Sequence, residues 1–287
     1  MALATRVPSN METAGFLPQQ WTAKTIDAAE NELVCWDAFD TDQWRTDLKK
    51  GARLYIPLTT HITAIEVVVG TIGSAASAST DITSGQTAIY IDIDKWYEVP
   101  HDIDEMSDLQ SQVSWQTKVQ KEQGYAIAKR MDTSMNALFS SLGTTSGSDG
   151  QTLDDDLLLD LTETLNEADV PQTERSLIID PSGLRDLMAF DKFISSQYTS
   201  TGAVTSGVIG KSLYGATVRV TNNLTAATTG AYAVLAHKDA LGGISQMQTA
   251  WKEDHKSYHI TRYNIEVLYG VKELRNTYGV NFYSRKS

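Results

Sequence analysis

The sequence predicts an α+β fold with elements that project from the body, and three observations support this prediction. From Ile103 to Leu142, most apolar residues of the stripe recur three, four or seven positions apart, which is the pattern of one long amphipathic helix. Residues 52–97 instead alternate between apolar and polar side chains around a Gly/Ser/Ala-rich tip, as in a long β-hairpin. Tyr258–Tyr283 is rich in Tyr, Val and Ile, which favours two or three closing strands.

Length and composition limit the classes of protein. The 287 residues allow one large domain or two small ones, and 41% hydrophobic residues are enough for a substantial core. A net charge of -12 argues against a protein that grips phosphate over its whole surface. The single cysteine, Cys35, excludes an intrachain disulfide and a zinc site built on several thiolates.

The first residues predict an extended arm. Residues 1–20 are polar and contain Pro8, Gly15 and Pro18, and they lack the continuous apolar core of a signal peptide. Trp21–Cys35 then has a rough apolar face that predicts a short helix. No run of residues in the sequence is long and apolar enough to cross a membrane.

The helix expected at 103–142 has a start and a stop signal. Ser107 followed by Gln110 fits a capping box, Gly143 is a natural end, and no proline interrupts the stretch. At 1.5 Å per residue such a helix would be on the order of 50 Å long. We therefore expect this helix to be a long, rigid structural element rather than one that only fills the core.

The second half of the chain predicts a compact α/β region after a polar linker, Thr144–Gln151. The expected helices and strands, with one loop, are Leu153–Ala168 (helix), Ser176–Asp180 (strand), Pro181–Phe193 (helix), residues 195–207 (loop), Ser212–Val220 (strand) and Ala231–Ala236 (strand).

The phosphate-binding motifs are incomplete. Gly207–Ser212 (GVIGKS) approaches the phosphate-binding loop, but Thr205 stands where the pattern needs glycine. Gly70–Ala75 (GTIGSA) is followed by no helix that would receive a pyrophosphate. The chain also contains no G-x-S-x-G elbow for a nucleophilic serine.

Histidine and carboxylate patterns give no metal or catalytic site either. His255 and His259 are four apart, but the residues around them alternate as in a strand. The run of three aspartates at 154–156 fits the start of a helix better than a calcium loop. Cys35 fits a small core residue. We therefore predict no catalytic, cofactor-binding or metal-binding residues and no cofactor.

Basic residues occur in two groups, at the hairpin base (Lys49, Lys50, Arg53) and along the long helix (Lys118, Lys121, Lys129, Arg130). Because Glu122 and Asp132 are interleaved with the second group, a solvated face of mixed charge is the favoured interpretation, and a nucleic-acid groove is the sharper alternative.

Several stretches resemble the major capsid proteins of tailed bacteriophages, in the same order and over nearly the whole chain. They are Phe16–Val34, Ala88–Asp104, Gln123–Phe139, Ser176–Met188, Gly210–Leu224 and Ala231–Gln246. The resemblance implies the Hong Kong 97-type capsid fold, with 1–48 as the N-terminal arm and 49–98 as the extended E-loop hairpin. Residues 99–149 and 256–287 would form the peripheral (P) domain, with 103–142 as its spine helix, and 150–255 the axial (A) domain.

The same resemblance implies a structural protein and not an enzyme. Such subunits self-assemble as hexamers and pentamers into the icosahedral virion head around the double-stranded DNA of a tailed phage, after synthesis in the bacterial cytoplasm. A portal protein and decoration proteins are further expected partners, DNA is enclosed without sequence-specific binding, and no membrane is involved. Because Leu58–Asp94 contains no lysine, the lysine–asparagine cross-link of some relatives is not expected.

The arm follows within about twenty residues of the first residue, so we expect a separate scaffolding protein rather than a fused scaffolding domain. Two alternatives remain open from the sequence. An encapsulin-type nanocompartment shell shares the fold but encloses enzymes. A soluble hydrolase that uses scattered Ser, His and Asp residues is the more remote alternative.

Overall fold

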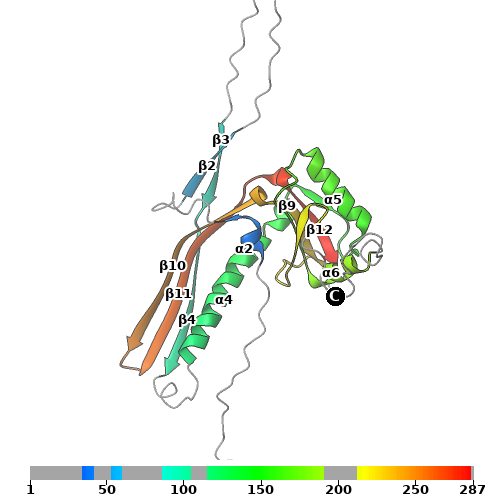
Figure 1. Ribbon diagram of the computed structural model, residues 1–287. Helices are drawn as coiled ribbons and strands as arrows, with labels where there is room; N and C mark the ends of the chain where they lie inside the picture. Colours follow the sequence, from blue (N-terminus) through cyan, green and yellow to red (C-terminus); the bar gives the residue numbers. More distant parts are fainter. Residues whose placement is uncertain (1–33, 42–52, 60–85, 105–114, 191–211, 286–287) are drawn as a thin grey trace, which may run out of the picture.

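The computed structural model describes residues 34–41, 53–59, 86–104, 115–190 and 212–285. The expected arm (1–20), nearly all of the helix expected at Trp21–Cys35, the hairpin tip and the loop at 195–207 lie outside these residues. Figure 1 shows two lobes, which we call the elongated lobe and the compact lobe, and a hairpin that projects beyond them.

The elongated lobe is a sheet with one long helix along it (Figure 1). The strand order is β1 (Asp40–Thr41), β10 (Leu241–His255), β11 (Ile260–Glu273) and β4 (Lys95–Asp104). β10, β11 and β4 are antiparallel, whereas the short β1 runs parallel to the start of β10. The helix is α4 (Trp115–Asn136).

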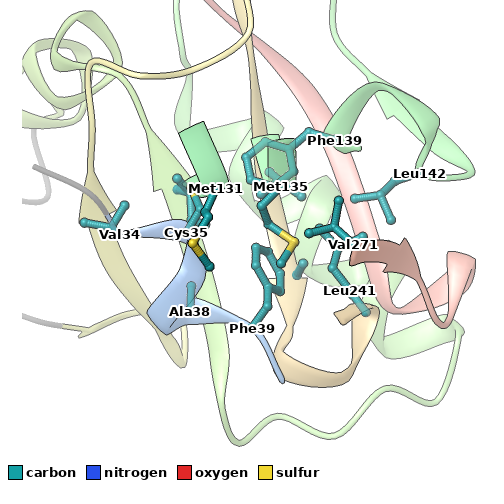
Figure 2. Packing of buried hydrophobic residues seen from close by; sticks show 14 of the residues in the cluster. Val34, Cys35, Ala38, Phe39, Met131, Met135, Phe139, Leu142, Leu241 and Val271 are labelled. Carbon is teal, nitrogen blue, oxygen red and sulfur yellow. The ribbon is translucent and has the colours of Figure 1, made fainter. Parts of the chain in front are cut away.

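The apolar stripe of α4 forms the main core. Ile127, Met131 and Met135 recur every four residues and are buried against β11. Figure 2 shows Met131 and Met135 in one cluster with Cys35 and Ala38 of the short helix α2 (Cys35–Ala38). The N-terminal segment thus completes the core of the elongated lobe.

The prediction of one helix from 103 to 142 is wrong at both ends. Ile103 and Asp104 belong to β4, where they pair with Thr261 and Ile260 of β11, so strand pairing with a distant segment overrides the local helical spacing. The helix ends at Asn136, and a short 3₁₀ turn, η1 (Phe139–Ser141), follows. The expected capping box at Ser107 lies outside the described residues.

A buried amide satisfies the backbone after α4. The side chain of Asn281 donates to the carbonyl of Phe139 at 2.8 Å and to that of Leu142 at 3.4 Å. These carbonyls therefore have a partner without further helix, and the chain turns into the compact lobe.

The hairpin is confirmed where it is described. β2 (Arg53–Thr59) pairs antiparallel with β3 (Gln86–Asp92). Residues 95–98, which we expected at its base, lie in β4 instead. The Tyr90 ring is covered by Arg53 at 4.1 Å and by Lys272 of β11 at 4.4 Å, so cation–π contacts link the hairpin base to the elongated lobe.

The compact lobe is a six-stranded sheet with two helices. Its strands in spatial order are β5 (Thr144–Ser146), β12 (Gly279–Arg285), β9 (Gly230–His237), β6 (Arg175–Ile179), β8 (Ala216–Val220) and β7 (Ser212–Leu213). Helices α5 (Asp155–Glu167) and α6 (Pro181–Met188) supply apolar faces to its core. Asp154 and Asp180 are their N-caps, because each carboxylate accepts a main-chain N–H of the first turn.

Three boundaries differ from expectation. Thr144–Ser146 is a strand paired with β12 rather than a linker. β12 lies in the compact lobe, although we expected 256–287 to stay with the long helix. Leu241–His255 lies in the elongated lobe, although we expected 150–255 to form one unit.

Glycine explains the last of these differences. A Cβ at Gly242 would meet the side chain of Leu274, and one at Gly243 would meet the ring of Trp36. Gly242 and Gly243 are therefore the start of a strand that passes close under its neighbours.

Two smaller corrections concern the compact lobe. The strand expected at Ser212–Val220 is a hairpin, because Tyr214 and Gly215 both have positive φ (49° and 81°) and turn the chain. The helix that begins at Pro181 ends at Met188, before the expected Phe193. In the part of the chain that is described, no helix is both long and apolar enough to span a bilayer.

Candidate functional site

The incomplete phosphate motifs lie almost entirely outside the described residues. This holds for 70–75 and for 207–211, and only Ser212 of the second motif is described, as the first residue of β7. His61 also lies outside the described residues.

The described histidines do not converge on one site. His255 ends β10, and His259 lies in the turn before β11 with φ 53°, so the two do not share a helix face. The ring of buried His237 accepts the N–H of Asp239 at 3.2 Å. His101 is exposed on β4.

The aspartates at 154–156 start α5, as expected. Asp154 accepts the N–H of Asp155 at 2.7 Å, and the Asp155 carboxylate accepts the hydroxyl of Tyr214 at 2.5 Å. Over the described ranges, no three His, Cys, Asp or Glu side chains lie together in a way that would hold a metal ion.

Cys35 is a packed core thiol. It is fully buried in the cluster of Figure 2. Burial, and after it the negative charge of Asp132, raises the pKa of the Cys35 thiol well above its ordinary value. A neutral, enclosed thiol is a poor nucleophile.

The structure brings together acidic and aromatic residues on the face of the elongated sheet that points away from α4. Tyr263, Val267 and Tyr269 of β11 are buried, and Val267 and Tyr269 belong to the α4 core. Because strand residues alternate, Arg262 and Glu266 point to the opposite face. We call this opposite face of β10, β11 and β4 the open sheet face.

Glu98 and Glu266 lie directly opposite each other on the open sheet face. Neutral donors hold them in place: Asn264 Nδ2 is 3.1 Å from Glu98 Oε2, and Trp251 Nε1 is 2.5 Å from Glu266 Oε1. Like charges on opposed strand positions are destabilising, and the hydrogen bonds from Asn264 and Trp251 offset part of that cost.

A third carboxylate on this face, that of Asp102, is paired with an arginine. Arg262 donates to Asp102 through two bonds of 2.7 and 2.8 Å. Hydrogen bonding to Arg262 lowers the pKa of the Asp102 carboxyl below its ordinary value. This bidentate pair ties β4 to β11 near the far end of the sheet.

Large aromatic side chains are exposed on the hairpin, on the elongated sheet and at its far turn. Tyr55 is 61% exposed, Trp96 66% and Tyr258 75%. Aromatic residues are enriched where protein surfaces meet. These positions, together with the open sheet face, are the candidate contact surfaces of the chain.

Asp132 does not belong to the solvated face of α4 on which we expected it. It is fully buried, whereas Lys129, Arg130 and Glu122 are exposed. Arg130 donates to the hydroxyl of Tyr97 at 2.7 Å. The outer face of the helix is therefore more basic than the sequence pattern indicated.

Sequence reasoning missed the residues of the open sheet face. The alternation of Trp96, Glu98, Pro100 and Asp102 was a usable signal, because the exposed positions of β4 follow it. The expected hairpin (49–98) takes in only Trp96 and Glu98 of these residues, and the expected helix begins after Asp102.

A shallow hollow lies between α4 and the sheet. It measures about 360 Å³ and is lined by Gln120, Gln123, Ala250, Trp251, Lys252, Tyr263, Asn264 and Ile265. The lining contains no carboxylate or histidine, and its titratable side chains are those of Lys252 and Tyr263.

Comparison with known proteins identifies the fold. No model of a known protein family and no curated protein matches the chain. Among solved structures, one from Mycobacterium phage Che8 matches with a TM-score of 0.79 and 22% identity, over 93% of this chain and 97% of that chain. The capsid structure of the Cyanophage P-SCSP1u matches with a TM-score of 0.76 and 16% identity, over 99% and 100%.

The capsid of a native GTA particle matches with a TM-score of 0.66 and 10% identity, over 98% of this chain and 100% of that chain. At these identities the similarity concerns the three-dimensional fold. The chain therefore has a phage-capsid fold, with helices and sheets mixed as an α+β architecture.

Proposed function

We propose that this chain is the major capsid protein of a tailed phage, a structural subunit that self-assembles into an icosahedral head around double-stranded DNA. The main support for this proposal is that the alignment with a known capsid chain covers nearly the full length of both chains. Up to 99% of this chain aligns with up to 100% of a capsid chain. A domain borrowed for another activity would leave part of one chain unmatched.

The lobes supply the parts that a shell subunit needs. In the Hong Kong 97-type fold, the elongated lobe with α4 would serve as the peripheral domain and the compact lobe as the axial domain. The β2–β3 hairpin would be the E-loop and residues 1–48 the N-terminal arm. From the strand pairing, the axial domain would end near residue 240, and β12 would also belong to it.

Open edges favour self-association. β10 pairs with β1 only at Gly242 and Gly243, and the outer edge of its later part, from Thr249 onward, has no partner strand among the described elements. Such an edge readily accepts a further strand. Together with the exposed aromatics, it gives the subunit several surfaces for contact with neighbouring copies.

The charge distribution suits a container. The net charge of -12 and the Glu98–Glu266 pair favour a wall that encloses DNA without sequence-specific binding. The proposed role is structural and not enzymatic, in the virion after assembly in the host cytoplasm. A separate scaffolding protein, a portal protein and decoration proteins are the proposed partners.

Mass measurements on the purified full chain test the proposal. We expect pentamers, hexamers or closed shells in sedimentation velocity, and assembly that increases with protein concentration. A monomer of 31.5 kDa at every concentration would contradict a shell role. Native particles should contain double-stranded DNA, whereas a cargo enzyme without a genome would support an encapsulin instead.

A further inference from the structure

One buried carboxylate connects three separate parts of the chain. Asp132 lies on α4 and is fully buried. Its Oδ1 accepts the main-chain N–H groups of Cys35 at 2.8 Å and Trp36 at 3.3 Å. Its Oδ2 accepts the side-chain amide of Asn223 at 3.0 Å. We call this arrangement the Asp132 clasp.

The Oδ1 side of the clasp fixes the N-terminal segment, residues 34–41. Cys35 and Trp36 open α2, and the Trp36 carbonyl accepts the hydroxyl of Thr41 at 2.7 Å. Thr41 in turn pairs with Gly243 of β10. The carboxylate therefore holds one end of a short segment whose other end is bound to the sheet.

The Oδ2 side fixes the compact lobe. Asn223 lies between β8 and β9, and its Nδ2 also donates to Thr133 Oγ1 at 3.1 Å. Its main-chain carbonyl accepts Asn136 Nδ2 at 2.8 Å. The nearby Thr221 donates its N–H to Ile179 of β6 at 3.0 Å, which connects this loop to the sheet of the compact lobe.

Both attachments depend on one small rigid group. A carboxylate is planar, so a rotation that moves Oδ1 away from Cys35 also moves Oδ2 away from Asn223. If the N-terminal segment leaves, water reaches the buried charge and competes with the amide of Asn223. If Asn223 leaves, Oδ2 keeps only the longer hydrogen bond from Asn136 Nδ2 at 3.4 Å, so the carboxylate turns away from α2 more easily.

We propose that Asp132 couples the seating of the N-terminal segment to the hold of the compact lobe on α4, so that release of one loosens the other. The arrangement is a conformational device within a single subunit. It would allow an event at the N-terminal segment to change the angle between the lobes. The coupling needs no neighbouring subunit and stands apart from the proposed shell function.

Hydrogen exchange on the unassembled full chain tests the coupling. Asn223→Ala removes the lobe-side donor and leaves both main-chain donors of α2, the N–H groups of Cys35 and Trp36, in place. We expect exchange of the amides in 34–41 to rise roughly tenfold relative to α5, the factor that corresponds to loss of one hydrogen bond to a charged group. Asn222→Ala, at the exposed neighbouring position, should leave that ratio unchanged.

If Asn223→Ala also lowers the stability of the whole chain, exchange rises in α5 as well. The ratio of exchange in 34–41 to exchange in α5 therefore still reports the coupling. An unchanged ratio, with loosening confined to 221–225, would overturn the coupling. The reverse direction uses Cys35→Pro, which removes the N–H that Asp132 Oδ1 accepts at 2.8 Å and leaves Asp132 itself unchanged. Exchange in 221–225 should then rise relative to α5, and an unchanged value would equally overturn the proposal.

Discussion

The side-chain amide of Gln123 donates to the main-chain carbonyl of Tyr263 at 2.9 Å, and its second proton reaches the carbonyl of Val99 at 2.6 Å. One buried side chain of α4 therefore bridges two neighbouring strands, β11 and β4. The contact fixes the helix along the sheet at a point where apolar packing alone would permit sliding.

Gln123→Leu should destabilise the chain by about 1–3 kcal/mol, because two buried carbonyls lose their donor while the volume stays similar. Chemical denaturation measures this change. Gln120→Leu, almost one turn earlier at an exposed position of the same helix, should stay within about 0.5 kcal/mol of wild type. Equal effects of the two substitutions would show that the bridge contributes nothing.

Gly270 is required where the hairpin base crosses β11. A Cβ at this position would collide with the main-chain carbonyl of Asp92, the last residue of β3. Gly270→Ala should cost about 1–3 kcal/mol, because backbone rather than a flexible side chain must move. Thermal unfolding gives the cost.

Gly124 is the matched control for Gly270. It is exposed in the middle of α4, and a Cβ there would meet nothing within 4 Å. Gly124→Ala should stabilise the chain by about 0.5–1 kcal/mol, because alanine restricts the unfolded chain and favours helix. Stabilisation by both substitutions would refute the close approach of Gly270 to Asp92.

Ala126 tests the continuity of α4. Its side chain is exposed, so a substitution removes no core contact. Ala126→Pro should destabilise the chain by roughly 3 kcal/mol or more, because the ring removes a helical hydrogen bond and clashes with the preceding turn. Ala126→Gly should cost only about 1 kcal/mol. Similar unfolding midpoints for the two variants would argue against an uninterrupted helix.

Cys35 should be unreactive in the folded chain. We expect Ellman's reagent at pH 8 to label it far more slowly than in denaturant, because the thiol is buried and its raised pKa keeps it protonated. Labelling that is as fast in the folded as in the unfolded chain would contradict the described packing of 34–41.

The raised pKa of the Cys35 thiol also predicts that the stability of the folded chain depends on pH. In the unfolded chain the pKa of the Cys35 thiol is about 8.5, whereas in the folded chain it is higher. The folded state then binds more protons above that pH, so the stability that the thiol contributes falls as pH rises. The stability difference between wild type and Cys35→Ala should therefore narrow from pH 8 to pH 10, and a constant difference would contradict it.

Elements with local signals could be predicted from the sequence. α5 could be predicted because its leucines follow the helical period behind an acidic start, and α6 because Pro181 and Ser182 open it. The β2–β3 pairing was foreseen because its alternation needs no distant partner to be visible.

Elements set by distant partners could not be predicted in the same way. Lys95–Asp104 becomes a strand because it pairs with residues more than 150 positions away in β11. The burial of Asp132 depends on Cys35 and Asn223, 97 and 91 positions away. Spacing along the chain contains no record of these contacts, so the pairing of β4 with β11 and the Asp132 clasp appear only in three dimensions.

Cryo-electron microscopy of the assembled full chain is the most direct test of the proposed capsid role. The account predicts closed shells with five-fold vertices, in which the elongated lobe, the compact lobe and the β2–β3 hairpin of each subunit fit the density and the hairpin contacts a neighbouring copy. Discrete particles without icosahedral symmetry, or subunits that remain monomeric under all assembly conditions, would contradict it.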